Sequence, residues 1–117
     1  IQSRRASANP KKAVGHKFKA KSVVYDGIKF QSTLEGDYYL HLKRLVAAGK
    51  VVFFLRQVPF HLPGSTRYVV DFQEFHADGS VVFTDVKGME TKEFVRAKKQ
   101  VEDLYPVEIN VVKKGGF

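Results

Sequence analysis

Two aspartates and a lysine on neighbouring predicted strands carry the strongest chemical signal in the sequence. Residues 80–87 alternate across a strand, so the side chains of Asp85 and Lys87 belong to the same face. A three-residue turn at 77–79 sets the register of the preceding strand, and this register places Asp71 opposite Asp85. Two opposed carboxylates among apolar neighbours repel each other, and a divalent cation with oxygen ligands would compensate that repulsion. The pattern therefore points to a metal site with a lysine at its edge.

The strand register leaves a structural alternative open. A slip by one residue would send Asp71 and Asp85 to opposite faces of the sheet, where one of them would be solvated. The length of the turn does not distinguish the two registers. The sequence by itself thus supports both a metal site and an ordinary pair of strand residues.

A third carboxylate, Glu35, belongs to a predicted helix. Over residues 33–48 apolar side chains recur at helical spacing. At about 100° per residue, Glu35 falls inside the apolar arc rather than on the solvent face. The run from Ser32 to Glu35 also fits a capping box, in which the glutamate returns to the amide of Ser32. A ligand role and a capping role for Glu35 both remain open.

The elements that must position these residues follow from turn signals and periodicity. An Asp-Gly pair between β-prone runs predicts a hairpin, and a glycine at position 49 ends the first helix. The expected order is a hairpin (23–30), a helix (33–48), an antiparallel meander (51–62, 67–76 and 80–87), a second helix (91–104) and a short strand (108–112). We expect an α/β domain with a mixed β-sheet flanked by two helices, and an N-terminal β-hairpin.

The positive charge is concentrated at the N-terminal end. The formal net charge is +8. Residues 1–22 contain no acid and seven basic side chains, namely Arg4, Arg5, Lys11, Lys12, Lys17, Lys19 and Lys21. We expect residues 1–21 to form a flexible basic arm that binds the phosphates of nucleic acid, or a solvated tail that only aids solubility. The folded domain is expected over 22–112 and a loose tail over 113–117.

Composition excludes several classes of protein. A chain of 117 residues is the size of one domain. The absence of cysteine excludes a disulfide scaffold, a thiolate zinc site and cysteine catalysis. No apolar run approaches the roughly 20 residues of a membrane span, so we expect no membrane partner.

The order and spacing of these residues resemble the PD-(D/E)XK nuclease superfamily. The resemblance rests on Ser32-Thr33-Leu34-Glu35, Gln57-Val58-Pro59, Tyr68-Val69-Val70-Asp71-Phe72 and Asp85-Val86-Lys87-Gly88. It covers the predicted domain and is closest to small phage-encoded members. The pattern is also similar to Holliday-junction resolvases and to the nuclease domain of transposon end-cleaving endonucleases. Two positions depart from the usual pattern: Val70 stands where proline is common, and the second acid is an aspartate.

The resemblance implies a restriction-endonuclease-like core and a metal-dependent DNA endonuclease. The implied site contains Glu35, Gln57, Asp71, Asp85 and Lys87, together with the backbone carbonyl of Val86. In this arrangement Asp71, Asp85 and the Val86 carbonyl bind Mg²⁺ or Mn²⁺, and Glu35 contributes directly or through water. Lys87 orients or activates the attacking water and offsets charge on the phosphate. Gln57 lines the site.

A basic stripe on the second helix is the other candidate for contact with DNA. Lys92, Arg96 and Lys99 recur at helical spacing, although a solvated helix face would show the same pattern. The resemblance further implies branched or junction DNA as substrate, in phage or mobile-element recombination or replication. It also implies a homodimer in a bacterial cytoplasm.

Two other functions are weighed against the endonuclease. One is a non-catalytic nucleic-acid-binding module with a nuclease-like fold. The other is an endonuclease subunit that cuts only with a partner protein of recombination or replication. Metal-dependent cleavage by the isolated chain would distinguish the endonuclease from both.

Overall fold

The computed structural model of the chain describes residues 21–117. The expected basic arm, apart from Lys21, and the arm's DNA-binding candidates from Arg4 to Lys19 lie outside the described residues.

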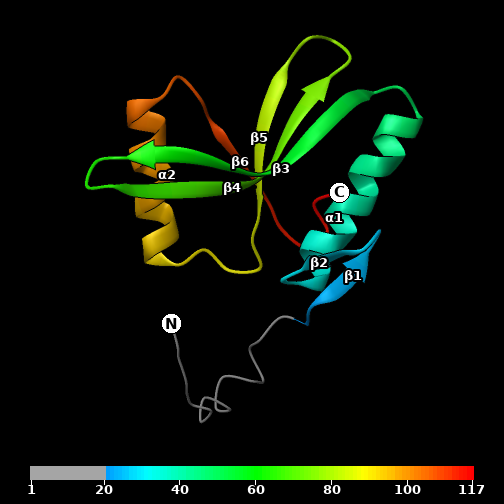
Figure 1. Cartoon of the computed structure of the whole chain (residues 1–117), viewed down its shortest axis with the longest axis horizontal. Helices are drawn as coiled ribbons and strands as arrows, with labels where there is room; N and C mark the ends of the chain where they lie inside the picture. Colours follow the sequence, from blue (N-terminus) through cyan, green and yellow to red (C-terminus); the bar gives the residue numbers. More distant parts are fainter. Residues whose placement is uncertain (1–20) are drawn as a thin grey trace.

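A mixed four-stranded sheet forms the centre of the fold (Figure 1). The elements are β1 (Val23–Tyr25), β2 (Ile28–Phe30), α1 (Thr33–Ala47), β3 (Val51–Leu62), β4 (Thr66–His76), β5 (Val81–Val86), α2 (Lys92–Leu104) and β6 (Ile109–Val112). The sheet order is β3-β4-β5-β6, in which β6 runs parallel to β5 and the other neighbours are antiparallel. The expected α/β class, mixed sheet, two helices and N-terminal hairpin are confirmed.

Two apolar clusters hold the helices to the sheet. Helix α1 and the β1–β2 hairpin enclose a cluster that includes Phe30, Leu42 and Phe72. Helix α2 covers a second cluster that includes Val70 and Val101. The two helices lie on either side of the central strands (Figure 1).

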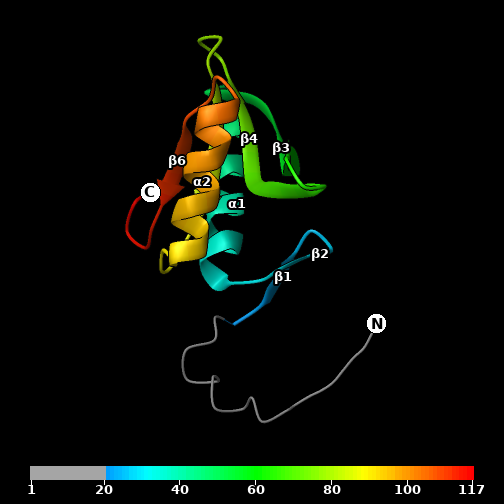
Figure 2. The same cartoon turned by 90° about the vertical axis from the view of Figure 1, so that its left-hand side faces the viewer.

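Strand β4 changes its neighbours near its middle. Phe72 packs in the cluster of α1, whereas Val70, only two residues earlier, packs in the cluster of α2. Pairing between β4 and β5 runs from Phe72 to Phe75 and stops there. The outer half of the β3–β4 hairpin therefore leaves β5 and turns towards α2, and Figure 2 shows the sharp bend. Asp71 lies at this bend.

The N-terminal hairpin packs tightly against the start of α1. Its two-residue turn has positive φ angles at Asp26 (53°) and Gly27 (76°). Gly36 of α1 faces the hairpin so closely that an added Cβ would lie 2.5 Å from Val23 Cγ2 and 2.9 Å from Tyr25 Cε2. The absence of a side chain at Gly36 is what lets the hairpin dock beside Glu35.

We predict that Gly36→Ala destabilises the fold. Helix propensity alone would favour alanine by about 1 kcal/mol. The clash with two stiff side chains must displace the hairpin, so we expect a net loss of about 1–3 kcal/mol in the free energy of unfolding. Urea denaturation measures it. Gly88→Ala, where an added Cβ meets nothing within 4 Å, is the control. Equal stability of the two variants would contradict the prediction.

No helix in the described part of the chain is long and apolar enough to span a membrane.

Candidate active site

Asp71 and Asp85 face each other where β4 and β5 separate. The paired residues before this point, such as Phe72 with Thr84, have the predicted register. At the next position, Asp71 and Asp85, hydrogen bonds from the two side chains take the place of backbone pairing between β4 and β5. The Asp71 amide donates to Asp85 Oδ1 at 2.9 Å, and the Val86 amide donates to Asp71 Oδ2 at 2.9 Å. The two carboxylates thus satisfy backbone groups that the bend would otherwise leave unpaired.

One carboxylate oxygen at this position has no partner. Asp85 is only 1% exposed, and its Oδ2 is buried without a hydrogen bond from any described residue. Burial raises the pKa of Asp85, against the Asp71 amide and the charge of Lys87, which lower it. Burial likewise raises the pKa of Asp71, although the Val86 amide and Lys87 oppose the shift. An unpartnered buried oxygen is costly, and a cation would relieve that cost.

Glu35 is buried at the first turn of α1, as its position in the apolar arc predicted. It is 6% exposed. Its amide donates to the Ser32 hydroxyl at 3.1 Å, which is one half of a capping box. The carboxylate accepts from Gln57 Nε2 at 3.4 Å, and the backbone of Gln31 lowers its pKa. Burial and the nearby charge of Asp71 raise the pKa of Glu35. The Glu35 side chain therefore lies near Asp71, while the Ser32 hydroxyl caps the helix.

Gln57 connects Glu35 to the aspartates from strand β3. Its Nε2 donates to Glu35 at 3.4 Å, and its side chain also lowers the pKa of Asp71. Its φ angle is 55°, in the left-handed region that a residue with a side chain rarely adopts. Gln57 would pair with Asp71 in the β3–β4 register, yet neither residue is in the ladder there. The backbone is strained at the bend, next to the carboxylates.

We predict that Gln57→Gly does not destabilise the fold. A left-handed residue other than glycine costs about 1–3 kcal/mol, which glycine relieves at an entropic cost of about 0.5–1 kcal/mol. We therefore expect the free energy of unfolding to stay equal or to rise by up to about 2 kcal/mol. Gln73→Gly, in the regular part of β4, is the matched control and should lose about 1 kcal/mol. If Gln57→Gly lowered the free energy of unfolding as much as Gln73→Gly does, the contacts of the Gln57 side chain would contribute more to stability than the backbone strain costs.

Lys87 follows β5 and approaches the carboxylates from the side of α2. Its ammonium lies 4.8 Å from the ring centre of Phe94, a buried residue of α2. Its amide donates to the Val112 carbonyl at 2.9 Å, which fixes the backbone. The charge of Lys87 lowers the pKa of each of the three acids. The five predicted side chains of the site are thus brought together.

Arg56 is a site residue that the sequence analysis missed. Its charge lowers the pKa of both Glu35 and Asp71, opposing the effect of burial. Its position directly before Gln57 was the signal that could have identified it. In a sequence with 20 basic residues, that adjacency alone does not stand out.

The basic stripe of α2 is separate from the carboxylates. Lys92, Arg96 and Lys99 are all exposed, as expected for either a DNA-binding or a solvated face. The ammonium of Lys99 lies 3.9 Å from the carboxylate of Asp103. An exposed pair of this kind contributes little stability, so the stripe remains available to a ligand.

The described residues hold no ready-made cluster of metal ligands. Among residues 21–117, no three His, Cys, Asp or Glu side chains lie close enough together to hold a metal ion by themselves. A metal at Asp71 and Asp85 would need backbone or water oxygens in addition. Mg²⁺ accepts such a set, because it keeps several waters and needs only one or two carboxylates.

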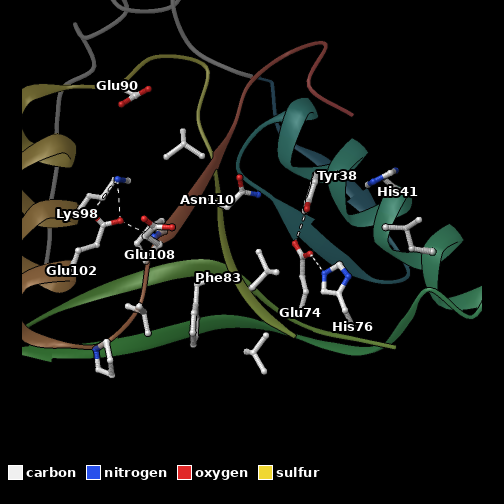
Figure 3. A pocket seen from close by; sticks show the side chains of 17 residues that line it. Tyr38, His41, Glu74, His76, Phe83, Glu90, Lys98, Glu102, Glu108 and Asn110 are labelled. Atoms are coloured by element: carbon white, nitrogen blue, oxygen red, sulfur yellow. Dashed lines mark hydrogen bonds and ion pairs between the residues drawn. The ribbon is translucent and has the colours of Figure 1, made fainter. Parts of the chain in front are cut away.

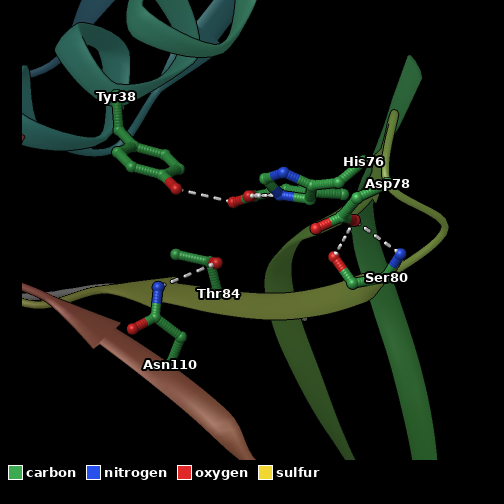
Figure 4. A network of polar contacts seen from close by, with 7 residues as sticks. Tyr38, His76, Asp78, Ser80, Thr84 and Asn110 are labelled. Carbon is green, nitrogen blue, oxygen red and sulfur yellow. Dashed lines mark hydrogen bonds and ion pairs between the residues drawn. The ribbon is translucent and has the colours of Figure 1, made fainter. Parts of the chain in front are cut away.

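A cleft of about 1,140 Å³ lies elsewhere, between α1, α2 and β6 (Figure 3). None of the predicted site side chains lines it. Its polar centre is Glu74, which accepts from the Tyr38 hydroxyl at 2.6 Å and contacts His76 Nε2 at 2.9 Å (Figure 3). Figure 4 shows how the side chains of Tyr38 and His76 point towards each other. The contact between Tyr38 and Glu74 fixes α1 against β4. Tyr38 lies one turn after Glu35, so the contact also helps to position Glu35.

The sequence comparisons identify a family without an assigned activity. Residues 15–114 match the model of a family described as "Protein of unknown function (DUF1064)". The matched range includes all the side chains of the candidate site. No curated protein matches the chain.

Proposed function

We propose that this chain, which belongs to the DUF1064 family, is a metal-dependent endodeoxyribonuclease that hydrolyses phosphodiester bonds. The observation that carries the proposal is the pair Asp71 and Asp85 at the separation of β4 and β5, with Glu35 near Asp71 and one buried oxygen of Asp85 without a partner among the described residues. The resemblance of the sequence to the PD-(D/E)XK superfamily also supports the proposal.

The carboxylates fit a hard divalent cation. Asp71 and Asp85 would hold Mg²⁺ or Mn²⁺ together with the backbone carbonyl of Val86, and Glu35 would act directly or through a bound water. The unpartnered oxygen of Asp85 supports this assignment, since it lacks any donor among the described residues. The chemistry that such an ion supplies is polarisation of the scissile phosphate and activation of water near neutral pH.

The remaining side chains of the site orient the reactants. Lys87, held over Phe94, is proposed to orient or activate the attacking water and to offset charge on the phosphate. Gln57 donates to Glu35 and lowers the pKa of Asp71, so it is proposed to position both carboxylates.

DNA is proposed to contact the basic arm and the basic stripe of α2. The carbonyl of Lys21 accepts from the Thr33 hydroxyl at 3.4 Å, two residues from Glu35. The arm therefore joins the domain beside the site, which supports a role in holding DNA there. Branched or junction DNA is the proposed substrate, in phage or mobile-element recombination or replication. A homodimer in the cytoplasm of a bacterial host is the proposed setting.

A non-catalytic nucleic-acid-binding module is the second candidate. The observation that favours it is the structural role of the aspartates, which satisfy the backbone amides of Val86 and Asp71. The absence of a three-ligand cluster among residues 21–117 likewise favours a subunit that cuts only with a partner protein.

Incubation with labelled DNA tests these candidates. The chain is mixed with end-labelled four-way junction, fork and linear duplex DNA in Mg²⁺, Mn²⁺ or EDTA, beside Asp85→Asn. We expect metal-dependent cutting of the branched substrates by the unaltered chain alone. Binding without cutting in every metal would overturn the proposal for the isolated chain, and restoration by a partner would identify a subunit.

We also predict that added metal stabilises the fold more at pH 8 than at pH 5. Burial raises the pKa of Glu35, Asp71 and Asp85 in the folded chain. The stability that these acids contribute is therefore present below the unfolded pKa of about 4, where they are protonated, and is lost as the pH rises through the higher folded pKa values. Ionised carboxylates are the form that binds a metal, so added metal restores more stability at pH 8 than at pH 5. Thermal unfolding with and without Mn²⁺ measures the difference. A pH-independent shift, or an equal shift in Asp85→Asn, would contradict the prediction.

A further inference from the structure

Arg56 places a cation on the opposite side of Asp71 from Lys87. In the β3–β4 pairing Arg56 lies opposite Phe72, the residue that follows Asp71. Lys87 approaches from the end of β5, on the other side of β4. The proposed site is therefore flanked by positive charges from two strands.

The guanidinium is held by an aromatic ring rather than by an acid. Its central carbon lies 4.7 Å from the ring centre of Phe30, which is fully buried. No described carboxylate lies within 4.0 Å of it, although its charge acts on Glu35 and Asp71. The ring thus orients the side chain without taking up its hydrogen-bond donors, and no acid among residues 21–117 forms an ion pair with it.

One donor of Arg56 lacks a partner among residues 21–117. Its Nε is buried and makes no hydrogen bond to any described residue. An unpaired donor on a charged group costs free energy unless a ligand supplies an acceptor. The side chain also lines a groove of about 370 Å³ between α1 and β3, together with Lys43 and Phe53. The guanidinium thus borders space in which a ligand could lie.

We infer that Arg56 binds a backbone phosphate of the DNA strand that enters the site. The inference rests on the proposed function for the identity of the ligand. A guanidinium presents a planar fork of donors that matches two phosphate oxygens. A divalent cation bound at Asp71 would neutralise the carboxylate that attracts Arg56. The guanidinium would then be free to bind a phosphate, so metal binding and DNA binding would not compete.

A purely structural role for Arg56 predicts a different effect of Arg56→Lys. If the side chain only packed on Phe30 and balanced the acids, Arg56→Lys would keep the charge but lose the planar stack on the ring, so it would lower the melting temperature without weakening DNA binding by the folded chain. Binding of a phosphate by two donors requires the fork. Arg56→Lys therefore separates the two roles.

The test compares Arg56→Gln and Arg56→Lys with Arg44→Gln. Arg44 is an exposed residue of α1 whose replacement makes the same change in net charge. Binding of a labelled four-way junction is measured with Ca²⁺ in place of Mg²⁺, over a series of salt concentrations and well below each melting temperature. Calorimetric titration with Mn²⁺ alone reports on the metal site, and cleavage is followed separately.

We expect Arg56→Gln to weaken DNA binding at least about tenfold and to reduce the salt slope by about one. Arg56→Lys should keep the salt slope but bind at least about threefold more weakly than the unaltered chain. Arg44→Gln should change neither quantity by as much. Affinity for Mn²⁺ should not fall in either Arg56 variant, because a neighbouring cation is removed or kept and no ligand is lost.

Other outcomes would overturn the inference. Full affinity in Arg56→Lys, or equal effects of Arg56→Gln and Arg44→Gln, would leave Arg56 a structural residue, while continued cleavage by the unaltered chain would preserve the proposed function. Conversely, an unaltered chain that neither cuts DNA nor binds Mn²⁺ would refute the nuclease. A selective loss of DNA binding in Arg56→Gln would still support the phosphate contact in that case.

Discussion

Replacing Asp85 by asparagine is expected to lower metal-dependent DNA cleavage by at least about 1,000-fold while the fold persists. Asparagine keeps an oxygen that can accept from the Asp71 amide, so the contact between β4 and β5 survives. It removes the negative charge that holds a divalent cation. Gel analysis of end-labelled junction DNA measures the loss.

The same substitution is not expected to destabilise the metal-free chain. Asp85 is buried, and burial raises its pKa, so the ionised carboxylate is disfavoured in the folded state near neutral pH. We expect the free energy of unfolding at pH 7 to stay equal or to rise. Asp78→Asn, in the exposed turn before β5, is the matched control for cleavage and should retain full activity. Inactivity of both variants, or unfolding of Asp85→Asn, would remove the evidence for a metal ligand at this position.

Replacing Glu74 by alanine is expected to cause the largest loss of stability, about 3–5 kcal/mol. Glu74 is 2% exposed and contacts both the Tyr38 hydroxyl and the imidazole of His76 (Figure 3). Its removal leaves a buried hydroxyl without its acceptor and opens a cavity under α1. Because Tyr38 lies one turn from Glu35, we also expect cleavage to fall.

A matched pair of variants checks the Glu74 prediction. Glu108→Ala removes the same side chain from an exposed position and should change the free energy of unfolding by less than about 0.5 kcal/mol. Tyr38→Phe should fall between the two, since it removes one hydrogen bond but keeps the ring in the core. Urea denaturation that ranks Glu74→Ala with Glu108→Ala would show that the network contributes nothing to the docking of α1.

Local patterns predicted the elements and most of the site. The turn at 77–79 predicted the register of β4 and β5, and Phe72 does pair with Thr84 as that register requires. Helical periodicity predicted the burial of Glu35. Both features depend on residues that are close together in the sequence, so local sequence patterns are enough to predict them.

The bend at Gln57 and Asp71 could not be predicted in the same way. Each half of β3 and β4 alternates like an ordinary strand, and the change of packing partner from α1 to α2 depends on which helix each half meets. The contact between Tyr38 and Glu74 joins residues 36 positions apart. Arg56 becomes a site residue only because the fold sets it beside Phe30. Tertiary packing decides all three.

The reciprocal bonds between Asp71 and Asp85 also bear on how the chain folds. A β5 strand that docked one residue out of step during folding would turn Asp85 away from the Asp71 amide and leave the Val86 amide without an acceptor. Intermediates with a misaligned β5 would then carry unpaired polar groups in an apolar interior. The cost of these groups favours dissociation of β5 and its pairing again in the native register. The acids proposed to cut DNA thus also select the native hairpin over its misfolded competitors. Apolar replacements at these positions are expected to yield slower refolding and more aggregate than asparagine does.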